Sequence, residues 1–406
     1  MKNRSKDWIG RPIALGQIQV NDGGKVVNAV ALWPAMLVAA ALAQTALAGP
    51  SSASPSRADL AVPRYSHIFV IMEENKEYRQ VFDRQNAPNV SRLAKTYGLA
   101  TQFYAEVHPS EGNYVALVSG DTYGIHDDDA FYCTAGDKDK FCEKASEPGY
   151  LSHTSTAAHI GSQLEKAGFS WKGYYESIPG PGSKAILAGD PKMGFGAAKW
   201  ELYASKHSGF INFASVQNSP KRESRLVGFD QLDKDLSSGA LPSFALIVPN
   251  QCNEMHGLYP ADYSPAVAGR IPPDCNHDNV PGLIRRGDAI VARIVAKIQR
   301  SPVWRSSQNV AIVVTFDEGA GKSRAGCCGI DPSSSGNFGG GHIATIVVTN
   351  HGPRGVVDNT PYSHYSLLRT VEDAFGIHEY LRHAADTSKG VRPMTPLFQT
   401  KPTPRP

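Results

Sequence analysis

HIFVIM at residues 67–72, FALIVP at 244–249 and AIVVTF at 311–316 are three apolar runs rich in β-branched residues. Near-continuous apolar runs of this length are typical of strands that are buried on both faces, as in parallel sheets. Each run is followed by polar side chains, namely Glu74-Asn75, Asn250 and Asp317-Glu318. Open α/β sheets bind their ligands at the carboxyl ends of such strands. The sequence therefore predicts an enzyme whose site lies at one edge of a parallel sheet.

Helical patterns lie between the predicted strands. Residues 288–300 repeat apolar side chains at the spacing of a helix that faces a core. Further helices are predicted at 89–96, 157–166 and 364–375, and a further buried strand at 342–350. Strands that alternate with helices predict an α/β fold with a mostly parallel central sheet and helices on both faces. The aromatic stretch 171–176 is compatible with either a pocket wall or the core.

The amino-terminal 48 residues have the pattern of a secretory signal peptide. A basic leader precedes the mostly apolar stretch Val26–Leu47, and Ala46-Leu47-Ala48 has the small-x-small form of a cleavage site. An uncleaved membrane anchor is the alternative. We therefore expect a signal peptide at 1–48, a linker at 49–62, a catalytic domain at 63–383 and a loose Pro-rich tail at 384–406, in a secreted or periplasmic protein.

Removal of residues 1–48 would take away five of the 41 basic and two of the 38 acidic side chains, and would leave 36 of each. A balanced charge argues against a general polyanion binder, so no nucleic-acid partner is expected. An acidic substrate must instead be held locally, by a metal ion or by a few side chains.

The six cysteines fit an oxidising compartment. Cys133 and Cys142 bracket a short polar loop that they could close, and Cys252 and Cys275 flank a segment that carries His256. Cys327 and Cys328 are adjacent, and a bridge between neighbours requires strain. The pairing stays open at this point. Zinc binding by these cysteines is disfavoured because the sequence has no CxxC pair.

Glu74 and Asn75 follow the first strand directly and form a candidate metal site. Carboxylate and amide oxygens suit Mg²⁺, Ca²⁺ and Mn²⁺, and carboxylates also bind Zn²⁺. Taken alone, such a pair is more often a turn than a ligand set. His108 precedes Ser110 by two residues, and an imidazole so close to a hydroxyl could act as a general acid.

The segment HPSEGNY at 108–114, which leads into ALVSG at 116–120, resembles the nucleophile segment of the alkaline-phosphatase-like superfamily. More narrowly, the chain is similar to the bacterial phosphoesterase family of secreted acid phosphatases, phosphatidylinositol-3-phosphate phosphatases and phospholipases C. The resemblance implies that Ser110 is a metal-activated nucleophile at a helix start and that Asn113 helps to hold the phosphoryl oxygens. The alternative is that Ser110 only caps the helix.

Three more motifs extend the resemblance over residues 64–380: PNQCNEMH at 249–256, TFDEG at 315–319 and PYSHYSLLRTVED at 361–373. The first has Glu254 where the family usually has Asp. The resemblance implies a cation held by Glu74, Asn75, Ser110, Asp317 and Glu318. Glu254, His256 and His364 would bind a second ion or hydrogen-bond the phosphate. His207 lies in an element that resembles one near the family's substrate pocket, so it is a candidate for contact with the leaving group.

The resemblance implies a metal-dependent phosphoric ester hydrolase that works in two displacements through a phosphoserine. One or two divalent ions are expected, with Ca, Mg, Mn and Zn all open. The family's phospholipases C are generally longer, which favours a phosphomonoesterase of the acid phosphatase or phosphoinositide phosphatase type. A phospholipase C-type phosphodiesterase is the alternative, and an inactive exported binding protein is a third. A phospholipid substrate would bring transient contact with a membrane surface. The oligomeric state stays open.

Overall fold

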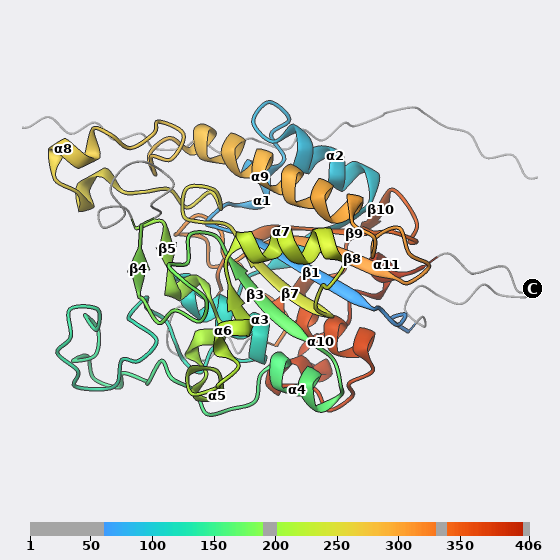
Figure 1. The fold of residues 1–406 in the computed structure, drawn as a ribbon, viewed down its shortest axis with the longest axis horizontal. Coiled ribbons are helices and arrows are strands. Elements are labelled where there is room, and N and C mark those ends of the chain that lie inside the picture. The colour runs from blue at the N-terminus through green and yellow to red at the C-terminus, as the bar shows by residue number, and fades with distance from the viewer. Residues whose placement is uncertain (1–60, 190–200, 330–338, 401–406) are drawn as a thin grey trace, which may run out of the picture. The chain divides into compact units, whose positions relative to one another are not determined.

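The computed structural model describes residues 61–189, 201–329 and 339–400, and a nine-stranded sheet forms their centre (Figure 1). The strands follow the order β10-β2-β9-β8-β1-β7-β3-β6, and β11 pairs with β2. The strands are β1 (His67–Glu73), β2 (Gly98–Tyr104), β3 (Trp171–Tyr175), β6 (Leu226–Val227), β7 (Phe244–Val248), β8 (Val310–Phe316), β9 (His342–Thr349), β10 (Val356–Asp358) and β11 (Tyr362–Ser363). A separate two-stranded sheet joins β4 (Leu187–Ala188) to β5 (Tyr203–Ala204).

The three apolar runs that open the sequence analysis are neighbouring parallel strands. β1 lies between β7 and β8, with Ile68 opposite both Phe244 and Ala311. Every residue of β7 and β8 is buried, as the near-continuous apolar pattern predicts. The aromatic stretch at 171–176 forms β3 beside β7, and Trp171, Tyr174 and Tyr175 are buried. This stretch therefore belongs largely to the core.

The strand predicted at 342–350 is present as β9, but it is antiparallel to both of its neighbours, β8 and β2. A parallel pair requires a crossover connection, usually a helix, whereas an antiparallel pair can be joined by a loop. β9 is the next strand after β8, and the described residues between them, 317–329 and 339–341, contain no helix, as an antiparallel pair allows. The other pairings in this sheet are parallel, and the predicted mostly parallel α/β fold is confirmed.

Helices cover both faces of the sheet (Figure 1). On one face lie α2 (Pro88–Thr96), α7 (Phe229–Ser238) and the long α9 (Val280–Arg300), and on the other lie α3 (Glu111–Ser119), α4 (Ile160–Lys166) and α10 (His364–Phe375). Shorter helices are α1 (Tyr78–Val81), α5 (Ala214–Gln217), α6 (Arg222–Arg225), α8 (Pro265–Ala268) and α11 (Thr395–Phe398). No helix among the described residues is long and apolar enough to cross a membrane.

The two predicted terminal segments have different outcomes. The signal peptide and nearly all of the linker lie outside the described residues. Most of the segment that we expected to be a loose tail is packed: α11 follows the turn at Arg382–Ala385, and Leu397 and Phe398 are buried. The Tyr65 hydroxyl donates a hydrogen bond to the carbonyl of Phe398 at 2.6 Å. The high Pro content led to the prediction of a loose segment, although Leu397 and Phe398 near its end pack into the core.

The six cysteines pair in sequence order, as Cys133–Cys142, Cys252–Cys275 and Cys327–Cys328. The first two bridges close the two excursions suggested by the sequence. The third joins adjacent residues, a pairing that the sequence analysis had left open because of its strain.

Replacing Phe398 by Ala tests whether the carboxyl-terminal segment is part of the core. Phe398 is fully buried and its ring packs edge-on against Tyr65, with centroids 5.6 Å apart. We expect the free energy of unfolding, measured by urea denaturation, to fall by about 3–5 kcal/mol. Leu151→Ala, at a side chain that is 50% exposed, is the control and should change it by less than about 0.5 kcal/mol. Equally small effects would mean that the segment is loose.

Candidate active site

The ends of β1 and β8 bring two acidic side chains together. Glu73 pairs with Phe316 in the parallel register, and the amide of Asp317 donates a hydrogen bond to the carbonyl of Glu73 at 2.9 Å. Asn75 adopts a left-handed conformation (φ 53°) that turns its own amide to Asp317 Oδ1, at 3.0 Å. Glu74 and Asp317 therefore meet at the sheet edge where the sequence predicted a site, and both are fully buried.

The hydroxyl of Ser110 points at these carboxylates. Ser110 is the residue before α3 and is 1% exposed, but its side chain makes no capping hydrogen bond to that helix. Instead Oγ donates a hydrogen bond to Glu74 Oε2 at 3.0 Å. Burial raises the pKa of Asp317, and hydrogen bonds from the amide of Asn75 and the hydroxyl of Ser110 oppose that effect. The role of Ser110 is thus not that of a helix cap.

Two buried histidines and a third carboxylate lie on the other side of Glu74. Nε2 of His207 is 3.3 Å from Glu74 Oε1, and its Nδ1 is 2.8 Å from Glu254 Oε1. Nδ1 of His256 hydrogen-bonds the carbonyl of Gly257 at 2.8 Å. Glu74, His207 and His256 each offer a ligand atom, and these atoms all lie within 4.8 Å of one another. These three residues are far apart in the sequence, and the fold brings them together.

His108 and Glu318 form a second pair beside Ser110. Nδ1 of His108 lies 2.5 Å from Glu318 Oε2, and its Nε2 hydrogen-bonds the carbonyl of Ser323 at 2.8 Å. Burial raises the pKa of Glu318 to about 8. Burial favours the neutral form of His108, but the hydrogen bond and the charge of Glu318 outweigh it and raise the pKa of His108. The pair can therefore hold a proton near neutral pH.

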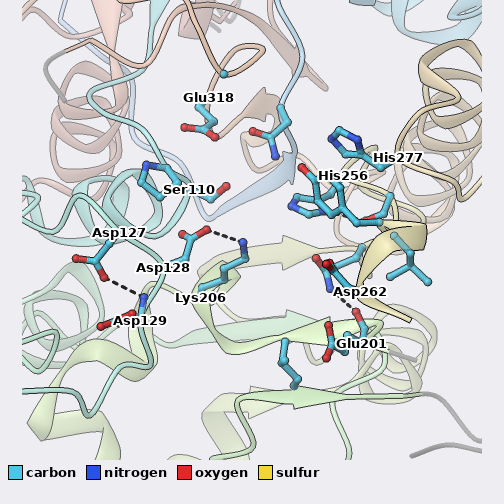
Figure 2. A pocket seen from close by; sticks show the side chains of 18 of the residues that line it. Ser110, Asp127, Asp128, Asp129, Glu201, Lys206, His256, Asp262, His277 and Glu318 are labelled. Atoms are coloured by element: carbon cyan, nitrogen blue, oxygen red, sulfur yellow. Dashed lines mark hydrogen bonds and ion pairs between the residues drawn. The ribbon is translucent and has the colours of Figure 1, made fainter. Parts of the chain in front are cut away.

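These groups open onto a cavity of about 950 Å³, whose lining includes Ser110, Lys206, His256 and Glu318. In Figure 2, Ser110 and Glu318 lie on one side of this pocket, while His256 and His277 lie on the other. Nζ of Lys206 forms an ion pair with Asp128 Oδ2 at 2.7 Å. The cavity is large enough for a phosphoryl group together with an organic substituent.

The site holds more negative than positive charge. Burial raises the pKa of Glu74 and of Glu254 well above the usual value, and the repulsion of Asp317 adds to the shift of both. Burial lowers the pKa of Lys76 to about 8, although the same carboxylates oppose this. Such strongly perturbed groups in a cavity are typical of active sites.

The sequence model of the Phosphoesterase family matches residues 69–378, a span that contains all of these groups. The chain belongs to the Phosphoesterase family. It is accordingly a hydrolase that acts on phosphoric esters.

Curated relatives of this phosphoesterase are phosphatases. It is 26% identical over 348 residues to a phosphatidylinositol-3-phosphatase of Mycobacterium tuberculosis, a match that covers 85% of this chain and 89% of the relative. It is also 26% identical to a probable acid phosphatase of Kluyveromyces lactis (81% of this chain, 63% of the relative). An acid phosphatase of Aspergillus fumigatus is likewise 26% identical (77% and 55%). The chain thus spans less than two thirds of these two fungal relatives.

Among solved structures, a protein in the alkaline phosphatase superfamily from Vibrio parahaemolyticus aligns with a TM-score of 0.45 at 13% identity, over 78% of this chain and 69% of that one. The periplasmic domain of a phosphoethanolamine transferase from Campylobacter jejuni aligns with a TM-score of 0.45 at 9% identity, over 85% and 98%. Similarity at this level supports no argument about the site.

Two predicted site residues, Asn113 and His364, make hydrogen bonds to groups that support the site. The amide oxygen of Asn113 accepts hydrogen bonds from the backbone of Glu106 and Val107, and its amide nitrogen donates to the carbonyl of Val107. Asn113 therefore holds the loop before Ser110, and these bonds use only one of the two N–H groups of its amide. Its contact with a phosphoryl oxygen stays a prediction.

The predicted role of His364 as a metal or phosphate ligand needs correction. Its Nδ1 lies 2.5 Å from Glu106 Oε2, and its Nε2 must donate to the carbonyl of Phe316 at 2.9 Å. Burial would lower the pKa of His364, but Glu106 outweighs burial and raises it. An imidazolium with both nitrogens engaged has no lone pair for a metal ion. His364 instead holds the backbone next to Asp317.

The remaining donor set fits a divalent cation. Asp317 Oδ2 and Glu254 Oε2 are buried and accept no well-aligned hydrogen bond among the described residues, and Glu254 Oε1 faces Nδ1 of His207 at 2.8 Å. Buried carboxylates without partners are costly unless a cation or a proton compensates them. Oxygen ligands from Glu74 and Asp317 together with imidazole nitrogens of His207 and His256 suit several divalent ions. Glu318 is turned to His108, and the side-chain nitrogen of Asn75 donates to Glu74 Oε2 at 3.1 Å.

Three residues at the site went unassigned in the sequence analysis. Tyr114 donates a hydrogen bond to Glu74 Oε1 at 2.7 Å, and its ring stacks on His207. Lys76 donates to the carbonyls of Met255 and Asn75, and Lys206 lines the cavity. Each lies next to, or within a few residues of, a predicted site residue, so its position in a motif was the only signal available.

The helix that carries Ser110 is anchored by a buried histidine. Nδ1 of His153 lies 2.9 Å from Glu111 Oε2, and its Nε2 lies 3.1 Å from Asp127 Oδ1. Asn212 also donates to Glu111. Burial favours neutral His153, but the two carboxylates outweigh it and raise its pKa to about 10. His153 therefore fixes the first residue of α3 to the loop at 127–129 on the pocket wall.

Replacing His153 by Gln tests this anchor through its pH dependence. Because the folded-state pKa is near 10 and the ordinary value is 6.5, the stabilisation is complete below pH 6.5 and is lost as the pH rises through 10. We expect the variant to be less stable than the wild type by about 3 kcal/mol at pH 6, with a smaller difference at pH 9.5, in urea denaturation. His378→Gln, at a side chain that is 73% exposed, is the control. A difference that does not change with pH would show that His153 is uncharged.

Proposed function

We propose that this protein is an exported, metal-dependent phosphomonoesterase in which Ser110 is the nucleophile. One observation carries the proposal: the Ser110 hydroxyl, at the buried end of the cavity, donates to Glu74 Oε2 at 3.0 Å and lies beside Asp317. A buried hydroxyl that contacts one carboxylate and lies beside a second matches the needs of a metal-activated nucleophile. The curated relatives named above are phosphatases, which favours monoesters over diesters.

Glu74 and Asp317, with His207 and His256 beside them, are the residues that would hold the cation. When bound there, the ion would lower the pKa of the Ser110 hydroxyl and neutralise charge on the phosphoryl oxygens. Tyr114 keeps Glu74 in place through its hydrogen bond. Lys206, whose ammonium interacts with the charges of Glu74 and Glu318, adds positive charge on the cavity side.

The chemistry follows two displacements. The hydroxyl proton of Ser110 passes to Glu74 Oε2, which accepts its hydrogen bond, as Oγ forms a bond to phosphorus. The bond to the leaving alcohol breaks, and the proton held by His108 and Glu318 passes to the leaving oxygen. A water molecule then attacks the phosphoserine and returns a proton to the same pair. Phosphate leaves, and Ser110 takes its proton back from Glu74. His108 suits this role because its Nδ1 is 2.5 Å from Glu318 Oε2, and Glu318 lines the cavity together with Pro109 and Ser110.

Export is part of the proposal. The pattern of residues 1–48 supports it, and so do the three disulfides among the described residues, because such bonds persist in oxidising compartments.

Hydrolysis assays test the substrate type. With a divalent cation present, we expect turnover of p-nitrophenyl phosphate that is at least about 100-fold faster than that of bis(p-nitrophenyl) phosphate, since Lys206 and the cation suit a doubly charged phosphoryl group. Phosphatidylcholine should not be cleaved. A chelator should abolish turnover, and added cation should restore it. Faster cleavage of diesters would favour the phospholipase C type, and no turnover with Mg²⁺, Ca²⁺, Mn²⁺ or Zn²⁺ would favour an inactive binding protein.

Replacing Ser110 by Ala tests the nucleophile. We expect kcat for p-nitrophenyl phosphate to fall by at least about 10³-fold, since loss of a nucleophile removes the covalent route. Ser119→Ala is the matched control, because Ser119 is buried at the other end of the same helix and bonds only backbone carbonyls. Acid quenching during turnover should trap a phosphoryl group on Ser110 in the wild type. A variant that keeps more than a tenth of the activity would show that Ser110 is not the nucleophile.

A further inference from the structure

Two aromatic rings that the proposed chemistry does not use lie on the cavity wall. The rings of Tyr259 and His277 are stacked, with centroids 3.8 Å apart and planes inclined by 25°. Both residues line the cavity that contains Ser110. Tyr259 is 39% exposed, which is unusual for a large ring in this protein, where most are buried. A partly exposed ring on a pocket wall is available to contact a ligand.

A short series of rings connects this pair to the metal-binding group. The ring of His256 lies 5.5 Å from that of His207 and 5.7 Å from that of Tyr259, centroid to centroid. In Figure 2, His277 lies beside His256, across the pocket from Ser110. A substrate whose phosphoryl group is at Ser110 would therefore extend its organic part along this wall.

The pair is held rigidly, although it lies on an excursion outside the main sheet. The amide of Leu258 donates to the carbonyl of Cys275 at 2.8 Å, and the amide of His277 donates to the carbonyl of Leu258 at 3.0 Å. The Cys252–Cys275 disulfide closes the same segment. The two rings are thus aligned before any ligand binds, and a preorganised surface loses less entropy on binding.

We infer that the Tyr259–His277 pair is the contact surface for the leaving group, and that the preferred substrates are phosphomonoesters whose alcohol carries a flat ring. The inference rests on the proposed function, because the leaving group is placed relative to Ser110. A cavity of about 950 Å³ is far larger than a phosphoryl group, so the leaving group stays in contact with the protein. A flat ring can pack against the exposed part of the Tyr259 ring, stacked or edge-on, whereas a linear alkyl chain gains less from this contact.

Two substrates with leaving groups of similar acidity isolate this effect: benzyl phosphate and butyl phosphate. The measured quantity is the ratio of their kcat/KM values, in which changes to the chemical step cancel. We expect the wild type to favour benzyl phosphate and Tyr259→Leu to lower the ratio about tenfold. Tyr259→Phe should keep the ratio within about twofold, since it retains the ring. Tyr132→Leu is the matched control, because Tyr132 is 38% exposed but does not line the cavity.

An unchanged ratio in Tyr259→Leu overturns the inference. If both kcat/KM values fall by the same factor, the ratio is unchanged and Tyr259 has only a structural role. Binding of benzylphosphonate and butylphosphonate, measured by calorimetry with Mg²⁺, Ca²⁺, Mn²⁺ and Zn²⁺ in turn, separates this inference from the proposed function. If the wild type hydrolyses neither ester but binds benzylphosphonate more tightly, and Tyr259→Leu loses that preference, the proposed function fails and the aromatic contact stands. If the two phosphonates bind equally to the wild type, the aromatic contact fails.

Discussion

The accumulation of buried carboxylates at one edge of the sheet is the constraint on which the rest of this structure depends. Glu74, Glu254 and Asp317 are fully buried; burial raises the pKa of each, and the charge of Asp317 raises the pKa values of Glu74 and Glu254 further. Like charges removed from water repel strongly, and such an arrangement persists only where the surrounding backbone is fixed. Here the amides of Glu74 and Asp317 are fixed by hydrogen bonds to the carbonyls of Glu254 and Glu73. A bound cation would relieve the repulsion and would stabilise the folded chain at the same time.

The sequence predicted the part of the site that strand patterns determine. Glu74 and Asp317 each follow an apolar run, and parallel strands that are neighbours end at the same edge, so their meeting follows from the pattern alone. The position of Ser110 was predicted by its motif. A serine before a helix has the same sequence pattern whether it caps the helix or faces a site. Only the folded chain shows that the Ser110 hydroxyl bonds Glu74 and does not cap the helix.

The parts that were wrong or missed depend on contacts that no local pattern encodes. The side chain of His364 bonds Glu106, which is 258 positions away in the sequence, and the side chain of Asn113 bonds the loop that precedes Ser110. Both residue types are chemically suited to a phosphate site, but here their side chains bond the backbone and the carboxylate of Glu106, next to that site. The direction of β9 was likewise undetermined, since a buried apolar run has the same appearance in a parallel and in an antiparallel pair. The burial of Leu397 and Phe398 was obscured by a composition rich in Pro.

The pocket rim is stabilised differently from the sheet edge. The excursions that contain Asp127–Asp129 and Tyr259 each have only a small apolar cluster of their own, and each cluster includes the two cysteines of a disulfide. Clusters of this size bury too little apolar surface to fix long polar loops. A disulfide compensates by restricting the unfolded chain, which is worth about 2–4 kcal/mol. The proposed catalytic groups therefore depend on the core of the sheet, whereas the surface proposed to contact the leaving group depends on covalent links. Changes to that surface need not disturb Ser110.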